Sequence, residues 1–323
     1  MVGQATAKKP IKILFVGGYG RSGSTVLDLL LDRVPGITAV GEFRHLFGRA
    51  LGDNELCSCG LPFHECTYWT KIIAVAFPQG YDREQIRKAV KTFNTITRVP
   101  QLQRPTLMTP ALKRQAKIYA EAYLAVYRAI ATVSGASVIV DSSKYPMHGL
   151  FLQTQPDIDL KTMLLVRDPR AVAYSWQRHR VRPEVHWETR EMPRHAVIRS
   201  ALAWNTANKL TQMIGNDHQT FRLQRYEDFI DDPINTIQDI ASFAQGKKVT
   251  LNQSIFDNQL TTPHTVAGNP ARLGGEHIAV QTDKEWETQL GSIKKKIVAT
   301  CCARQMRHFG YRPAASTAIL HSQ

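Results

Sequence analysis

The stretch IKILFVGGYGRSGST, residues 11–25, decides the fold class. Residues 11–18 are apolar except for Lys12 and end in glycines, which is the pattern of a strand buried on both faces of a parallel sheet. Residues 18–25 form a Gly-rich loop, and the Leu-rich residues 26–33 continue as a helix. This order predicts a phosphate-binding loop, in which backbone N–H groups and a helix N-terminus face an anion.

The spacing of this loop follows the nucleotide-binding pattern G-x4-G-K-[ST] at every position but one. Ser24 stands where the pattern has lysine, and the nearest cation is Arg21. A loop that binds nucleoside triphosphates uses that lysine on the β- and γ-phosphates. The missing lysine therefore argues against a P-loop kinase, although a kinase is the closest alternative function. The loop can still bind an anion.

Further apolar runs of strand length lie along the chain, with helical patterns between them, at residues 38–40, 137–140, 160–166 and 220–223. Strands that alternate with helices predict right-handed crossovers. The fold class is therefore α/β, with a P-loop-containing parallel β-sheet flanked by helices on both faces. No linker divides the chain, so we expect a single domain over residues 11–312 and flexible tails at 1–10 and 313–323.

The charge of the 323-residue chain favours a polyanionic partner, because 41 Lys and Arg against 27 Asp and Glu give a formal charge of +14. Residues 11–18 are too short to cross a bilayer and no later segment reaches the length needed, so we expect a soluble, cytoplasmic protein without a membrane partner. A nucleic-acid-binding protein is the rival from a different class, but it would interleave basic and aromatic residues on one face. The basic residues in the motifs follow strands instead, so we expect no nucleic-acid partner.

The second motif is VRDPRAVAYS, residues 166–175. Arg167 ends a predicted strand, at the sheet edge where α/β proteins bind ligands. Asp168 and Pro169 are residues typical of a helix N-cap and first helical position. Ser175 lies two turns further on, so its hydroxyl and the planar guanidinium of Arg167 suit one phosphate monoester.

These two motifs resemble those of the sulfotransferases that use 3′-phosphoadenosine 5′-phosphosulfate (PAPS). GYGRSGST resembles the family's 5′-phosphosulfate loop, and VRDPRAVAYS resembles its 3′-phosphate motif. RYEDFIDDP, residues 225–233, is similar to the family's Y-E-D-x-x-x-D-P stretch, and GNPARLG, residues 268–274, to its late basic loop. The resemblance spans about residues 11–275 in family order and implies the sulfotransferase three-layer sandwich.

The resemblance also implies roles for residues of this chain. By this resemblance, the phosphosulfate of PAPS is bound by the loop residues Arg21, Ser22, Gly23, Ser24 and Thr25. The 3′-phosphate is bound by Arg167, Ser175 and Arg272, and the adenine lies against Tyr226. The product PAP retains this 3′-phosphate. Arginine at position 21, where cytosolic members carry lysine, is more similar to the carbohydrate, tyrosyl-protein and bacterial branches.

Sulfuryl transfer needs a base for the acceptor proton and positive charge on the leaving phosphate, and it needs no metal. Glu42, in VGEFRH, matches a glutamate of the bacterial and tyrosyl-protein members and is the predicted base; its alternative is a surface pair with Arg44. Arg21 supplies charge, and Lys144 resembles a lysine that steadies the transferring group, although an exposed lysine is the alternative. His45 and His148 are the other candidate bases.

Three cysteines cluster at Cys57, Cys59 and Cys66, with His64 between them. The C-x-C spacing is tighter than that of most zinc sites, so a local disulfide or a packed thiol cluster is favoured over zinc, which stays the alternative, and no metal site is predicted.

The predicted acceptor is a small molecule. The Arg- and His-rich residues 178–199 border the acceptor pocket in the family, and a solvated loop is the alternative there. We expect a hydroxyl or amine of a natural product, polar alkaloids included, ahead of a carbohydrate and then a peptide tyrosine.

Overall fold

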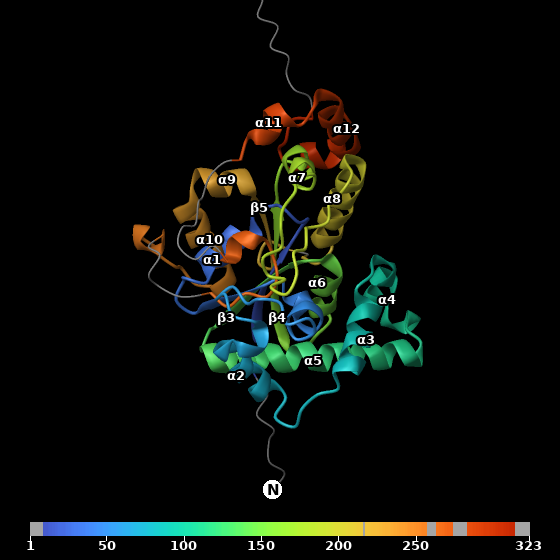
Figure 1. Cartoon of the computed structure of the whole chain (residues 1–323), viewed down its shortest axis with the longest axis vertical. Coiled ribbons are helices and arrows are strands. Elements are labelled where there is room, and N and C mark those ends of the chain that lie inside the picture. Colours follow the sequence, from blue (N-terminus) through green and yellow to red (C-terminus); the bar gives the residue numbers. More distant parts are fainter. Residues whose placement is uncertain (1–8, 216, 257–262, 274–282, 314–323) are drawn as a thin grey trace, which may run out of the picture.

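In the computed structural model, which describes residues 9–215, 217–256, 263–273 and 283–313, five parallel strands form one sheet in the order β2-β3-β1-β4-β5 (Figure 1). The strands are β1 Ile11–Gly17, β2 Ile37–Gly41, β3 Val138–Lys144, β4 Ile158–Val166 and β5 Phe221–Arg225. The predicted strands are confirmed, and β3 continues past its apolar run to Lys144. The tails predicted at 1–10 and 313–323 lie almost wholly outside the described residues.

Helices connect and cover the strands. The α-helices are α1 Ser24–Leu31, α2 Thr67–Ala76, α3 Arg83–Phe93, α4 Val99–Gln103, α5 Pro110–Ser134, α6 Pro146–Gln153, α7 Pro169–Ser175, α8 Val197–Gln212, α9 Tyr226–Asp231, α10 Pro233–Gln245, α11 Glu285–Gln289 and α12 Ser292–His308. The 3₁₀ turns are η1 Phe43–His45, η3 Phe63–Glu65, η4 Ile96–Arg98, η5 Pro105–Leu107, η6 Gln253–Phe256 and η7 Pro270–Leu273, and η2 Leu46–Ala50 is a π-helical turn. None of the described helices is long and apolar enough to cross a membrane.

Alternate residues of β1 build the two apolar cores on either face of the sheet. Ile13 and Phe15 pack with residues of α5 and α6, while Leu14 and Val16 pack with residues of α1 and α10. Figure 1 shows α1, α9 and α10 on one side of the strands and α6 and α8 on the other. The predicted α/β fold with helices on both faces is therefore confirmed.

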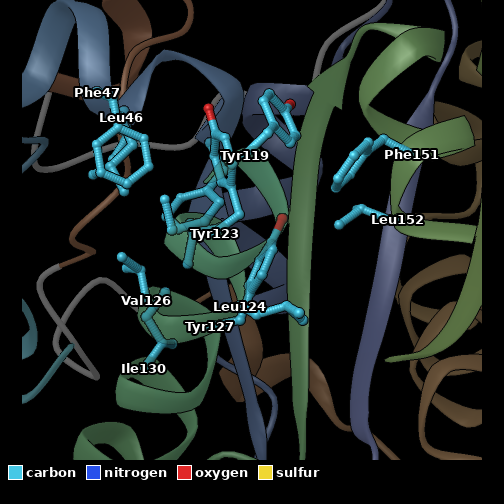
Figure 2. Close-up of a cluster of buried hydrophobic side chains, with 14 of the residues drawn as sticks. Leu46, Phe47, Tyr119, Tyr123, Leu124, Val126, Tyr127, Ile130, Phe151 and Leu152 are labelled. Atoms are coloured by element: carbon cyan, nitrogen blue, oxygen red, sulfur yellow. The ribbon is translucent and has the colours of Figure 1, made fainter. Parts of the chain in front are cut away.

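A row of tyrosines on α5 holds the segment after β2 in place. Figure 2 shows them between two pairs of apolar side chains: Tyr119, Tyr123 and Tyr127, with Leu46 and Phe47 on one side and Phe151 and Leu152 on the other. The rings of Tyr123 and Phe47 lie 5.1 Å apart edge to face, and the Tyr123 hydroxyl donates to the carbonyl of Arg44 at 2.9 Å. The short turn that follows Glu42 is thus fixed against the core.

The carboxyl ends of all five strands meet at one edge of the sheet, because the strands are parallel. The Gly-rich loop follows β1, Glu42 follows β2, Lys144 ends β3, Arg167 follows β4 and Tyr226 follows β5. The motifs of the sequence therefore converge at the edge where α/β sheets bind ligands.

Candidate active site

The Gly-rich loop turns sharply into α1 by means of two residues in the left-handed region. Arg21 has φ 73° and Gly23 has φ 91°. A Cβ at Gly23 would lie 2.3 Å from the ring of Tyr226, so the ring occupies the space that any side chain there would need. A non-glycine residue held in this region costs on the order of 1–3 kcal/mol, a cost that tends to be kept at functional sites.

A cavity of about 400 Å³ opens beside this loop. We call it the cationic cavity, because its wall carries seven basic side chains against the carboxylates of Glu42 and Asp283: Arg21, Arg44, Arg49, Lys144, Arg167, Arg180 and Arg182. Gly23, Ser24, Thr25, Ser175 and Tyr226 also line it. The cavity thus brings most of the predicted PAPS residues together.

The cations of this cavity repel one another. Burial, and then the charge of Arg180, lower the pKa of Arg21. Burial, and then the charge of Arg178, lower the pKa of Arg180. An anion in the cavity would relieve this repulsion, so the arrangement is suited to a ligand with several negative charges.

Glu42, Lys144 and Ser24 form the polar centre of the edge. The Lys144 ammonium donates to Glu42 Oε1 at 2.7 Å and to Ser24 Oγ at 3.0 Å. Both charged side chains are largely buried, with exposed fractions of 13% for Lys144 and 16% for Glu42. Lys144 has φ 58°, a second strained basic residue at this site. A cation from β3 therefore reaches the loop at Ser24, the position where triphosphate-binding loops have their own lysine.

The charges around Glu42 keep it ionised. Burial alone would raise its pKa, but Lys144, His45 and Arg44 together hold that pKa well below the ordinary carboxyl value. Burial and Arg44 lower the pKa of His45 to about 3, so this imidazole is neutral at pH 7. Its Nε2 lies 3.6 Å from Glu42 Oε2. Of the two, Glu42 carries the charge.

Lys144 is positioned by a buried network at the end of β3. Asp141 accepts the backbone N–H of Ser143 at 2.8 Å, and its other oxygen accepts from the Tyr127 hydroxyl at 2.5 Å and lies 3.0 Å from His148 Nε2. Burial opposes ionisation of Asp141, but His148 and these hydrogen bonds lower its pKa. His148 is therefore a buried structural residue. Together, Asp141 and His148 support the end of β3, from which Lys144 projects.

Arg167, Tyr226 and Ser175 lie together on the wall of the cationic cavity. The Arg167 guanidinium carbon sits 4.6 Å from the centre of the Tyr226 ring, and a guanidinium nitrogen lies 3.4 Å from a carboxylate oxygen of Asp283. The indole N–H of Trp204 donates to the Arg167 carbonyl at 3.1 Å, which holds the backbone after β4. α7 begins as predicted, because the Asp168 side chain accepts from the backbone N–H of Arg170.

A second cavity of about 720 Å³ adjoins the first. The two share wall residues, among them Gly20, Glu42, Lys144 and Trp176. We call the second one the apolar cavity, because most of its other lining is apolar or aromatic: Tyr19, Ile96, Tyr145, Pro146, Ile198, Leu202, Ala203, Ala207 and Leu210. His195, Arg199 and Thr206 are the polar residues on the side toward α8.

The family model of the sulfotransferase domain matches residues 12–309 of this chain. The chain belongs to the sulfotransferase family. Among solved structures, the sulfotransferase domain from the curacin biosynthetic pathway is similar at 14% identity and TM-score 0.52, over 94% of this chain and 98% of that one. The corresponding domain of the Synechococcus PCC 7002 olefin synthase is 19% identical with TM-score 0.45, over 92% and 97%. No curated protein matches the chain.

Two predicted PAPS residues of this sulfotransferase are not on the wall of the cationic cavity. The Ser22 hydroxyl is buried and donates to the Tyr19 carbonyl at 2.8 Å. Arg272 is also buried and donates to the carbonyls of Thr265, at 3.0 Å, and Leu56, at 2.7 Å. Its neighbours Gly268, Asn269 and Ala271 do line the cavity, while Gly274 of the same motif lies outside the described residues.

Sequence reasoning missed most of the apolar wall and the carboxylates that hold two of the cations, although Arg182 lies in the segment 178–199 that it placed at the pocket. Ile198 and Leu202, spaced four residues apart on α8, are 55% and 56% exposed, and an exposed apolar pair on a helix is a signal that could have marked the wall. Arg49 and Arg182 are held by the buried carboxylates of Glu55 and Glu184 through contacts of 2.5 to 3.0 Å. No local pattern indicates that network, because it joins segments more than 120 residues apart.

The predicted packed thiol cluster is confirmed, and its alternative, a local disulfide, is wrong. Cys57, Cys59 and Cys66 are free thiols, and the sulfur–sulfur distances of 3.7 and 3.8 Å are far beyond the bond of about 2.05 Å in a disulfide. His64 is not their partner, because its Nε2 lies 3.1 Å from the Leu51 carbonyl. The imidazole beside the thiols is that of His264, which is 198 residues from Cys66.

Proposed function

We propose that this sulfotransferase moves a sulfuryl group from PAPS to a hydroxyl or amine of a small, largely apolar acceptor and releases PAP. One observation carries the proposal: a cationic cavity built on a phosphate loop meets an apolar cavity at Glu42 and Lys144. A polyanionic donor suits the first, an apolar acceptor suits the second, and the shared wall holds a base and a cation between them.

The donor is assigned to the cationic cavity by charge. The loop amides, Arg21, Ser24 and Thr25 would hold the phosphosulfate, since the loop ends at the N-terminus of α1. Arg167 and Ser175, both on the cavity wall, would hold the 3′-phosphate, and the ring of Tyr226 would lie against the adenine. We leave Arg272 out of this assignment because its guanidinium donates to the carbonyls of Thr265 and Leu56.

In the proposed reaction Glu42 takes the proton of the acceptor hydroxyl as the acceptor oxygen bonds to sulfur. The bond from sulfur to the 5′-phosphate oxygen breaks, and Arg21 and the loop amides stabilise the charge on that oxygen. Lys144 neutralises Glu42 while the cavity holds no anion. We propose that its ammonium, already 3.0 Å from Ser24 Oγ, turns to the sulfuryl oxygens and leaves the carboxylate a stronger base.

The apolar cavity selects the acceptor. A carbohydrate would bring many hydroxyls against side chains such as Ile198, Leu202 and Leu210, which offer them no hydrogen bond, and each unpaired hydroxyl is costly. A molecule with one reactive hydroxyl or amine and an apolar body would match both the wall and the polar centre. The proposal therefore places a carbohydrate acceptor second.

Calorimetric titration with PAP, with and without Mg²⁺, and with ATP tests the donor. We expect binding of PAP that is independent of Mg²⁺ and tighter than that of ATP. Arg167→Ala should weaken PAP binding by more than about tenfold, because a charged hydrogen-bond donor to a phosphate contributes on the order of 1.5–3 kcal/mol. Arg87→Ala, on the exposed face of α3, is the matched control. Tighter binding of ATP with Mg²⁺ would refute the proposal and favour a kinase, and an equal effect of both substitutions would refute the assignment of Arg167 to the 3′-phosphate.

A transfer assay with PAPS then tests the acceptor class. Long-chain alcohols and phenols should be sulfated at higher kcat/KM than oligosaccharides, and Leu202→Asp on the apolar wall should lower kcat/KM for the alcohols while PAP affinity stays unchanged. A preference for oligosaccharides would refute the apolar-acceptor part of the proposal alone.

A further inference from the structure

Three thiols and one imidazole nitrogen converge beside the sheet edge, outside the walls of both cavities described above. We call Cys57, Cys59, Cys66 and His264 the Cys₃His cluster, since their ligand atoms all lie within 4.8 Å of one another. The Sγ atoms of Cys59 and Cys57 are 3.7 and 3.8 Å from Cys66 Sγ. His264 Nδ1 is 3.3 Å from Cys66 Sγ and 3.7 Å from Cys57 Sγ.

These separations are those of a tetrahedron around a metal ion. With bonds of about 2.3 Å to sulfur and about 2.0 Å to nitrogen, a tetrahedral zinc ion holds sulfurs about 3.8 Å apart and sulfur and nitrogen about 3.5 Å apart. We propose that the Cys₃His cluster is a closed, structural zinc site. Four protein ligands leave no open position for a substrate, which distinguishes it from a catalytic zinc.

The backbone around the cysteines is arranged for metal-bound thiolates. Backbone N–H groups of Cys59, Leu61 and Trp69 lie close to the sulfurs of Cys57, Cys59 and Cys66 respectively. Gly60, with φ 85°, makes the tight turn that lets the chain fold back over the first two sulfurs. Hydrogen bonds from such N–H groups orient thiolate ligands and stabilise their charge.

Neighbouring residues also orient the imidazole of His264. Trp69 donates its indole N–H to the His264 carbonyl at 2.9 Å, and the Tyr68 ring stacks on the imidazole with the centres 4.6 Å apart. Ser58, between two of the cysteines, accepts from the backbone N–H of Thr265 at 2.6 Å and donates to the Pro263 carbonyl at 2.7 Å. His264 is therefore oriented on both flanks before any metal binds.

A zinc ion at this site would also explain why the charged side chain of Arg272 is buried next to it. Three thiolates and one Zn²⁺ leave a net charge of about −1. Arg272 forms no ion pair within the described residues, yet it is 2% exposed and its guanidinium bonds the carbonyls of Leu56 and Thr265, the residues next to Cys57 and His264. A buried guanidinium that no carboxylate contacts directly is costly, and an anionic zinc site beside it would add to the attraction of the nearby Glu184 and Glu55.

The zinc would connect this cluster to the reaction site. After His264 the chain pairs with the end of β2, where Val266 exchanges hydrogen bonds of 2.8 Å with Val40 and Glu42, and it then supplies Gly268 and Asn269 to the cationic cavity. A metal that fixes His264 to the cysteine loop therefore holds one wall of that cavity. This consequence, unlike the metal site itself, rests on the proposed function.

The test is metal analysis of the full chain expressed with added Zn²⁺. We expect about one zinc per chain, and in the Co²⁺-substituted protein the thiolate-to-cobalt charge-transfer band and strong ligand-field bands of tetrahedral coordination. His264→Ala and Cys59→Ser should lower zinc affinity more than about tenfold, and His264→Cys should restore it by supplying a fourth thiolate. His64→Ala and Cys301→Ser, which leave the cluster intact, should bind zinc like the parent. Absence of zinc and of the cobalt spectrum in the parent protein, or equal loss in the controls, would overturn the site.

PAP titration before and after removal of zinc by a chelator separates the two proposals. We expect chelation to weaken PAP binding by about tenfold and added Zn²⁺ to restore it. A protein that holds zinc and does not bind PAP would retain the metal site and lose the proposed function. A protein that is isolated without zinc after expression with added Zn²⁺, and still binds PAP, would retain the proposed function and lose the metal site.

Discussion

Replacing Lys144 with methionine removes the ammonium that lies 2.7 Å from Glu42 and keeps a side chain of similar length. Lys144 is the largest influence that lowers the pKa of Glu42, against a burial effect that raises it. Without the lysine, burial is opposed only by His45 and Arg44, so the carboxyl should take up a proton at a higher pH than in the parent protein.

The size of the effect follows from the pair's environment. At an effective dielectric constant of 20, unit charges about 4 Å apart interact by about 4 kcal/mol. Both side chains keep some solvent contact, at 13% and 16% exposure, so we take roughly half of that figure as a lower bound. Since one pH unit corresponds to 1.36 kcal/mol, the loss of activity on the acid side should move upward by about 1.5 to 3 pH units.

The assay is the pH dependence of kcat/KM for sulfuryl transfer, because this quantity reports ionisations of the free enzyme. The parent should keep its kcat/KM down to the low pH at which Glu42 is protonated, and Lys144→Met should lose it from a higher pH. Lys144→Arg keeps the charge, so its kcat/KM should fall at the same low pH as that of the parent, whatever its absolute rate. We call this fall the acid limb of the pH profile. An acid limb that does not move in Lys144→Met would refute both the ion pair and the role of Glu42 as base.

Three other outcomes follow from the same structure. Glu42→Gln should lower kcat by about 10²- to 10⁴-fold while PAP affinity, measured by calorimetry, changes little; comparable activity of this variant would exclude Glu42 as the base. Gly23→Ala should weaken PAP binding more than about tenfold, because its Cβ would lie 2.3 Å from the Tyr226 ring; unchanged affinity would mean that the ring and loop rearrange freely. Burial raises the pKa of Asp28 to about 8, so the folded state holds the extra proton between the unfolded value near 4 and pH 8, and stability falls as pH rises through that window. Asp28→Asn should remove this loss, at most about 4 kcal/mol between pH 5 and 8, as measured by urea unfolding at both pH values; parallel losses in parent and variant would contradict it.

The parts of the site that sequence predicted are those set by strand ends. Glu42 and Lys144 are 102 residues apart, yet both follow apolar runs that become neighbouring parallel strands, so their meeting at one edge is a consequence of topology. The same reasoning places Arg167, which follows β4, whereas Tyr226, which follows β5, is predicted from the family resemblance.

The parts that sequence missed depend on contacts without a local pattern. His64 lies within the cysteine segment, but the imidazole beside the sulfurs belongs to His264. Nothing in the residue spacing links His264 to the cysteine segment. Arg272 sits in a motif of the family, and its burial against two carbonyls arises from packing that a motif does not specify. The apolar wall from α8 was missed because apolar residues on a helix predict a core contact as readily as a pocket.

The shared wall of the two cavities bears on the kinetic order of the reaction. If donor and acceptor occupy them as proposed, each has its own cavity and neither has to leave before the other binds. The sulfuryl group then passes directly between bound molecules, and no residue of the protein has to carry it covalently. Initial-rate plots for varied PAPS at several acceptor concentrations should therefore intersect, as they do for a ternary complex, and should not run parallel as they do for a double-displacement reaction.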